Sequence, residues 1–408
     1  MISDLKSKVK SSNDYYFNKI YEFESVRAKM IMPKIPINGF SAHQEVITLR
    51  NKYTNESVIY NPNRRFRPMS KKKYNVVSEC KFEDVEKNTP SDIFGRIKSK
   101  FCTTASNLSK YAKNHGLLIF KEHDPLKFTP ESVEDFIGTA KDWIKEVDES
   151  YWGIVWNCNW RAGASIPHGH FNLIARNMPF PIQENYHLAR ENFLQVEGGD
   201  LFNSMIQTHR NLGLIVIDGT TVSMAYLTPK KNWGILIASR QDDAFFHNAI
   251  YSGADTMRSL GDSFNMAIVP EYKSVPNLAL FISRGNSDTL TSDFGTIEAL
   301  LGESVIDSDP FLLIKEMKNN YHYTQTETKD MLDDGCLGRY GPNGGKLEIP
   351  LSGRLAQHPE KGKDWCLKKT FSKGRNEDVA YWYKLELDGW DDAFDYYEGP
   401  YEVPESLK

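Results

Sequence analysis

The sequence predicts an α+β fold in which one unit of strands and a helix occurs twice. Two pairs of similar segments occur in the same order along the chain, and each copy also contains a segment with helical periodicity. The 408 residues are 40% hydrophobic and 12% aromatic, which is enough for sizeable cores. We therefore expect two related halves, each an antiparallel sheet with flanking helices, followed by a C-terminal extension.

The repeat is visible in two ordered matches. GLLIFKEHD (residues 116–124) resembles GILIASRQD (234–242). Both segments place a glycine before a four-residue apolar run, and both end in aspartate. SIPHGHFNLIAR (165–176) resembles SVPNLALFISR (274–284), with one residue of slippage. Each segment is typical of a buried strand. Chance similarity between short apolar strands is the alternative, but two matches in the same order favour duplication.

A helix is expected inside each copy. TPESVEDFIGTAKDWIKEV (129–147) starts with an N-cap threonine and a proline, and its apolar residues recur at helical spacing. DDAFFHNAIYSGADTMRSLGDSF (242–264) takes the equivalent place in the second copy. Ahead of the first copy, EVITLRN (45–51) and SVIYNPN (57–63) are predicted to pair as a hairpin.

These elements divide the chain into four expected parts. They are an N-terminal segment (1–40), a first half that carries the site (41–190), a second, degenerate half (191–320) and the C-terminal extension (321–408). The extension is turn-rich and then acidic and aromatic. It is expected to be a small irregular or β-rich appendage, or a tail that orders on a partner subunit.

Composition excludes several classes of partner. The net charge of −4 and the absence of a long basic face give no reason to expect nucleic acid as a partner. No apolar run of membrane-spanning length occurs, and the N-terminus lacks the apolar stretch of a signal peptide, so we expect no membrane partner. Five cysteines without a CxxC pair favour a reducing compartment, and a cytoplasmic location is predicted.

Histidines distinguish the two copies. Positions 123, 168 and 170 are histidine in the first copy, and the second copy has Gln241, Asn277 and Ala279 in their places. Loss of all three together predicts one working site and one degenerate copy. His168 and His170 alternate along a strand with an asparagine two residues further on, so the three side chains are expected to face one ligand.

The segment before these histidines indicates the kind of ligand. Residues 163–165 are small enough for backbone N–H groups to approach an anion. A neutral imidazole attacks phosphorus well, which favours nucleotidyl transfer. Two alternatives stay open. One is metal chemistry, in which Cys80 and His123 join His168 although no pair at zinc spacing supports it. The other is a role in binding alone.

The segment that contains both histidines resembles a segment of a known family. NCNWRAGASIPHGHFN (157–172) resembles the active-site segment of the galactose-1-phosphate uridylyltransferase branch of the histidine-triad superfamily. That branch also contains dinucleoside-polyphosphate and nucleotide-sugar phosphorylases. Three further segments are similar to other parts of the family: NPNRRFRP (61–68), residues 117–132 and residues 293–317. The resemblance therefore covers about residues 40–320. The residues that match the family's motif are Asn157, Gly163, Ser165, Pro167, His168 and His170.

The resemblance implies a role for each matching residue. His170 would attack the α-phosphorus of a nucleoside diphosphate derivative, His168 would orient it, and Ser165 would contact the leaving phosphate. An anionic acceptor would then discharge the intermediate. The resemblance also implies a homodimer. The remaining expected substrate contacts are Asn157, Gly163, Ala164, Asn172, Arg64 and Arg67.

Departures from the family limit what is expected. Asn172 stands where the family usually has glutamine, and LALF (278–281) replaces a second HxH segment. The family's zinc site often uses a CxxC pair early in the chain, and only Cys80 lies in that region. We therefore expect no metal or other cofactor, with a structural zinc as the alternative. We therefore predict a nucleotidylyltransferase acting on a nucleotide sugar or sugar phosphate. The alternatives are a nucleoside-polyphosphate or nucleotide-sugar phosphorylase or hydrolase, and a nucleotide-binding pseudoenzyme.

Overall fold

The computed structural model divides the chain into two compact units. One unit is Met1–Val196 with Ser204–Tyr321, and the other is Glu197–Asn203 with His322–Lys408. The first unit contains every predicted site residue. The residues that the structure describes are 5–12, 15–31, 42–66, 80–289 and 292–321, together with five strands of the C-terminal part.

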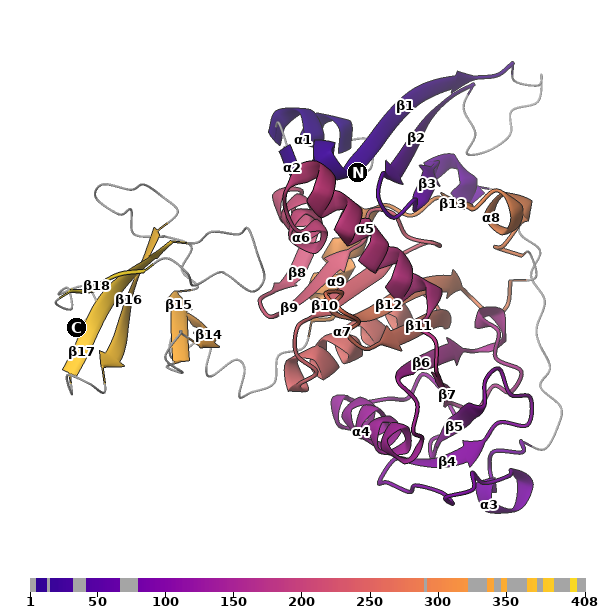
Figure 1. Cartoon of the computed structure of the whole chain (residues 1–408). Helices are drawn as coiled ribbons and strands as arrows, with labels where there is room; N and C mark the ends of the chain where they lie inside the picture. The colour runs from indigo at the N-terminus through magenta and orange to yellow at the C-terminus, as the bar shows by residue number, and fades with distance from the viewer. Residues whose placement is uncertain are drawn as a thin grey trace. The chain divides into compact units, whose positions relative to one another are not determined.

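A nine-stranded antiparallel sheet forms the centre of the first unit, in the order β4-β5-β7-β6-β11-β12-β10-β9-β8 (Figure 1). Its first four strands belong to the first copy, and the other five belong to the second. The strands of the first copy are β4 (Cys102–Ser106), β5 (Asn114–Phe120), β6 (Tyr151–Cys158) and β7 (His170–Arg176). Those of the second are β8 (Ile215–Asp218), β9 (Thr221–Ala225), β10 (Ile235–Ser239), β11 (Ser263–Val269) and β12 (Asn277–Gly285).

The strand order confirms the duplication. The order β4-β5-β7-β6 is repeated in reverse as β11-β12-β10-β9, and β6 pairs with β11 where the copies meet. The two predicted sheets are therefore one continuous sheet. The register confirms the predicted equivalence of His170 and Ala279, because His170 lies opposite Ile119 and Ala279 lies opposite Ile237.

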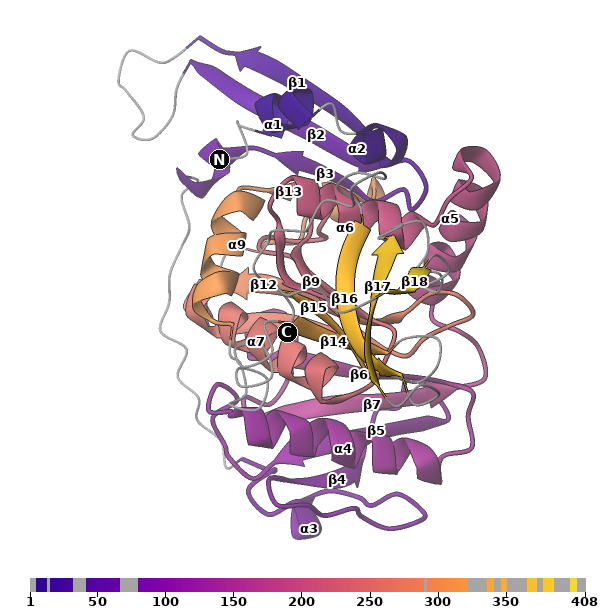
Figure 2. The same ribbon diagram turned by 90° about the vertical axis from the view of Figure 1, so that its left-hand side faces the viewer.

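Two helices, α4 (Pro130–Glu146) and α7 (Ala244–Leu260), contact each other and cover one face of this sheet (Figure 2). Both were predicted. Thr129 caps α4 by accepting a hydrogen bond from the Ser132 N–H, as its Thr-Pro start indicated. The Phe120 ring stacks on Phe136 of α4 at 3.9 Å. Because side chains alternate along a strand, His170 and its partner Ile119 face the other side.

A second, four-stranded sheet has the order β1-β2-β3-β13. The predicted hairpin is present, because β2 and β3 pair antiparallel with Ile47 opposite Tyr60. The strand β13 joins β3 in parallel, and the 3₁₀ helix η2 follows β3 and carries Arg64. The bounds are β1 (Tyr21–Lys29), β2 (His43–Asn51), β3 (Ser57–Tyr60), β13 (Glu303–Ile306) and η2 (Pro62–Phe66).

The remaining described helices have between three and 17 residues. No helix in the described part of the chain is both long and apolar enough to span a membrane. The bounds are α1 (Leu5–Ser12), α2 (Tyr15–Ile20), α3 (Val85–Asn88), η3 (Trp160–Ala162), α5 (Pro181–Glu197), α6 (Leu201–Asn211), α8 (Thr296–Leu300) and α9 (Pro310–Asn319).

The described part of the C-terminal extension consists of strands, in agreement with the β-rich alternative. Two of them pair as one antiparallel sheet and three as another. Their bounds are β14 (Cys336–Tyr340), β15 (Lys346–Pro350), β16 (Trp365–Ser372), β17 (Glu377–Lys384) and β18 (Tyr397–Tyr401).

Candidate functional site

His170 is the first residue of β7 and is only 7% exposed. Its Nδ1 lies 2.8 Å from the backbone oxygen of His168. A carbonyl oxygen only accepts hydrogen bonds, so Nδ1 carries the proton and Nε2 keeps its lone pair. Burial lowers the pKa of His170, so the ring is neutral near pH 7. The geometry is that of an imidazole held ready to act as a nucleophile through Nε2.

His168 has the opposite tautomer to His170. Its Nε2 lies 2.7 Å from the Phe120 backbone oxygen, so Nε2 donates and Nδ1 keeps a lone pair. Burial also lowers the pKa of His168. The Phe82 ring meets both histidine rings edge-on, with ring centroids 5.8 Å from His168 and 5.3 Å from His170. The two histidines therefore share one apolar wall, as their predicted alternation required.

The free Nδ1 of His168 belongs to a cluster of four possible metal ligands. Cys80, Glu83, His123 and His168 each bring one ligand atom within 4.8 Å of the others. Sγ of Cys80 lies 3.4 Å from Nδ1 of His168, and Nδ1 of His123 lies 2.5 Å from Oε1 of Glu83. A thiolate, a carboxylate and two imidazoles form a donor set that tetrahedral Zn²⁺ accepts. The Nε2–H bond to a backbone carbonyl is the outer contact that usually orients such a histidine.

Glu83 was missed in the sequence. The expectation that no metal is bound depended on the missing second cysteine of a CxxC pair. Glu83 follows Cys80 by three residues, which is the spacing of that pair. A search for any metal-ligating side chain at this spacing would have found it.

Asn172 lies two residues along β7 from His170 and is also buried. Its Oδ1 lies 3.1 Å from Nε2 of His115. The Tyr111 N–H donates to Nδ1 of His115, so the His115 proton is on Nε2 and is donated to Asn172. Asn107 donates to the same Oδ1. With its oxygen occupied, Asn172 presents its Nδ2 amino group as the donor for a ligand. His115 was not predicted, because it shows no recognisable spacing to the motif.

The small-residue loop differs from the expected anion cradle. Gly163 has a φ of +99° and closes a short turn. Its N–H donates to the Trp160 oxygen, and the Ala164 N–H donates to the Asn159 oxygen. In this conformation these two N–H groups are already engaged, so the expected backbone contacts with a phosphate are not available. Ser165 follows the turn and is exposed. The substrate-binding roles of Gly163 and Ala164 stay predictions.

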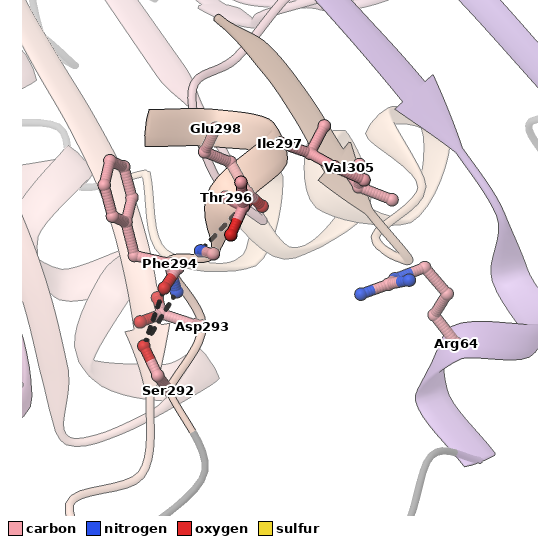
Figure 3. Close-up of a pocket in the computed structure, with 9 residues that line it drawn as sticks. Arg64, Ser292, Asp293, Phe294, Thr296, Ile297, Glu298 and Val305 are labelled. Atoms are coloured by element: carbon pink, nitrogen blue, oxygen red, sulfur yellow. Dashed lines mark hydrogen bonds between the residues drawn. The ribbon is translucent and has the colours of Figure 1, made fainter. Parts of the chain in front are cut away.

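Arg64, one of the two predicted arginines, does not share a pocket with the histidines. Arg64 reaches from η2 into a pocket of about 350 Å³, opposite the 292–298 segment (Figure 3). It also lines an adjoining pocket of about 240 Å³ with Arg161 and Arg284. Neither pocket is lined by His168 or His170. Arg67 lies outside the described residues.

The predicted asparagine of β6 does lie beside the histidines. Asn157 follows Trp156, which lies opposite Phe171 of β7. This register places Asn157 next to the start of β7, where His170 stands. The structure therefore brings together Asn157, His168, His170 and Asn172, and it places Arg64 elsewhere.

Comparisons with known proteins support the fold. No protein-family model and no curated protein matches the sequence. Among solved structures, an ADP-glucose phosphorylase from Arabidopsis thaliana with bound ADP-glucose has a TM-score of 0.51 at 17% identity, over 66% of this chain and 98% of that chain. A GalT-like protein from Arabidopsis thaliana has a TM-score of 0.50 at 16% identity, over 68% of this chain and 99% of that one. The chain therefore shares the overall fold of these two solved structures.

Proposed function

We propose that this chain is a nucleotidylyltransferase that acts on a nucleotide sugar or sugar phosphate through a covalent nucleotidyl-His170 intermediate. The observation that carries the proposal is the buried, neutral His170, whose Nδ1–H donates to the His168 carbonyl and whose Nε2 keeps its lone pair. The structurally similar ADP-glucose phosphorylase binds ADP-glucose, which agrees with a nucleoside diphosphate derivative as substrate.

The first step forms a bond between Nε2 of His170 and the α-phosphorus. The bond from that phosphorus to the leaving oxygen breaks, and the leaving sugar phosphate takes the electron pair. The Nδ1 proton stays in place, so the His168 carbonyl accepts from a ring that now carries positive charge. Asn157 and Asn172 donate to the phosphoryl oxygens, and Ser165 contacts the leaving phosphate. Loss of one such donor typically lowers kcat by about 10²–10³-fold.

The second step restores the enzyme. An oxygen of the anionic acceptor attacks phosphorus, the N–P bond breaks, and its electron pair returns to Nε2. A sugar phosphate as acceptor gives a transferase, and inorganic phosphate gives a phosphorylase by the same chemistry. The similarity to an ADP-glucose phosphorylase favours the phosphorylase as the second candidate. A homodimer remains part of the proposal.

The cluster around Cys80 leads us to replace the expectation of no metal with a proposed zinc site. Cys80, Glu83, His123 and His168 would hold the ion. When bound, the ion would neutralise the clustered negative charge and fix the His168 ring. Since the His168 carbonyl holds Nδ1 of His170, an ordered His168 keeps the nucleophile in place.

The proposal is tested by ³¹P NMR with UDP-glucose, UDP-galactose, ADP-glucose and GDP-mannose, each with inorganic phosphate or glucose 1-phosphate. One of these pairs should turn over, and the acceptor consumed separates transferase from phosphorylase. His170→Ala should lower the rate by at least about 10⁴-fold. His187→Ala, on α5, is the matched control and should stay within threefold. Activity retained in His170→Ala, or nucleotide binding without turnover by wild type, would sink the proposal.

A further inference from the structure

Where the two copies meet, the second half contributes a side chain to the nucleotide site. We propose that Asn265 is a positioning residue that orients the Asn157 amide and holds the loop before Gly163. This inference rests on the proposed function, because it assigns a role in the same nucleotide site. It extends that function by giving the degenerate half a part in the reaction.

The contacts of Asn265 lead directly to the site. Asn265 of β11 lies opposite Asn157 of β6 in the antiparallel register. Its Nδ2 donates to Oδ1 of Asn157 at 2.8 Å and to the backbone oxygen of Ala162 at 2.7 Å. Ala162 directly precedes Gly163. One amino group therefore holds both an expected phosphate-binding side chain and the start of the loop.

The orientation of the Asn265 amide is fixed by a third partner. Nη1 of Arg284 donates to Oδ1 of Asn265 at 3.0 Å, and an arginine can only donate. Arg284 is in turn held by Asp293, with Nε and Nη2 at 2.6 and 2.7 Å from the two carboxylate oxygens. The Asn265 amino group must therefore face Asn157. Because the Asn265 amino group occupies the side-chain oxygen of Asn157, the Asn157 amino group remains to donate to a phosphoryl oxygen.

The pseudosymmetry of the sheet shows that this amide pair is not a general feature of the junction. The position equivalent to Asn157 in the second copy is Ile268, and the position equivalent to Asn265 in the first is Ile154. These two isoleucines lie opposite each other further along the same ladder. The junction thus carries an apolar pair at one place and an amide pair at the symmetry-related place beside the histidines. An apolar pair would suffice for packing, so the amides indicate a role in the site.

The test is a double-mutant cycle on kcat and KM, measured with ADP-glucose and UDP-glucose, each with inorganic phosphate. Asn265→Asp keeps the size of the side chain and the Arg284 contact but removes the donor. We expect kcat to fall by at least about tenfold, and Asn157→Ala to lower it by about 10²–10³-fold. In the Asn157→Ala background, Asn265→Asp should add less than about threefold, because the two residues act as a unit. Asn277→Ala is the control and should leave kcat within about threefold of wild type. Asn277 begins β12, whereas Arg284 lies near the end of that strand.

Each outcome decides the proposal. A kcat within threefold of wild type in Asn265→Asp overturns it, and so do effects that multiply independently in the double variant. If Asn265→Asp does not fold, Asn265→Ala takes its place, since Arg284 keeps its partner Asp293. If wild type turns over neither substrate, the inference falls together with the proposed function. If wild type turns over a substrate and Asn265→Asp has the same kcat, the role of Asn265 is excluded and the proposed function stands.

Discussion

Gly169 separates the two motif histidines, and replacing it with alanine should lower both stability and turnover. A methyl carbon at Gly169 would lie 2.2 Å from Cδ2 of Phe120, whereas ordinary carbon contacts begin near 3.4 Å. The Phe120 ring is 2% exposed and stacks on Phe136 at 3.9 Å, so it has little room to move. Overpacking of this kind typically costs about 1–3 kcal/mol.

The effect on turnover follows from the backbone around Gly169. Its N–H donates to the His123 oxygen, and its oxygen accepts from the Phe120 N–H. If the backbone shifts to relieve the clash, the neighbouring His168 carbonyl that holds His170 shifts as well. A misplacement of about 1 Å lowers a rate by up to about 10²-fold. We therefore expect kcat for Gly169→Ala to fall by about 10–100-fold.

Gly116→Ala separates stability from chemistry. A methyl carbon there would lie 2.7 Å from the Trp143 ring, so it overpacks the same side of the sheet away from the histidines. Urea unfolding should show a loss of about 1–3 kcal/mol for both variants. Only Gly169→Ala should lose turnover beyond what its folded fraction explains. If Gly169→Ala keeps its stability within about 0.5 kcal/mol and its rate within threefold of wild type, the Phe120 ring does not constrain this position.

Three further predictions concern His209, His115 and the cluster around Cys80. Burial lowers the pKa of His209 to about 4, so the unfolded state binds more protons between pH 6.5 and 4, and stability should fall by about 2 kcal/mol from pH 7 to 5. Urea titrations of His209→Gln should show a shallower fall, and an identical fall would contradict this. His115→Phe removes the donor to Asn172 and should lower kcat by about tenfold; an unchanged kcat would show that Asn172 needs no such partner. Elemental analysis should find about one zinc per chain, and in Cys80→Ala both the zinc content and the melting temperature should be lower. Wild-type protein that contains no zinc, and whose melting temperature does not change when zinc is added, would exclude the site.

Local patterns predicted the elements because local physics determines them. The N-cap Thr129 and the helical spacing after it were enough to place α4, and the apolar runs placed β5, β7, β10 and β12. The comparison of the copies also gave the correct register of His170 and Ala279. Whether the two copies form two sheets or one depends on the pairing of β6 with β11, and no feature of either strand alone reveals it.

The site residues that escaped prediction act through distant contacts. His115 donates to an asparagine 57 positions away, and Asn265 to one 108 positions away. Neither spacing has a recognisable pattern. The loop N–H groups were predicted from residue size alone, but size does not show whether a turn already uses its own donors, as Gly163 and Ala164 do. Glu83 is the exception, because its spacing from Cys80 was visible in the sequence.

A covalent nucleotidyl-His170 intermediate can be trapped and identified by mass spectrometry. Wild-type protein is mixed with the nucleotide sugar that turns over, without acceptor, quenched within the first turnover and analysed by intact-mass and peptide mass spectrometry. We expect a gain of one nucleoside monophosphate on His170, which is lost when the acceptor is added and is absent in His170→Ala. Turnover without any adduct, or an adduct on another residue such as His123, would contradict it.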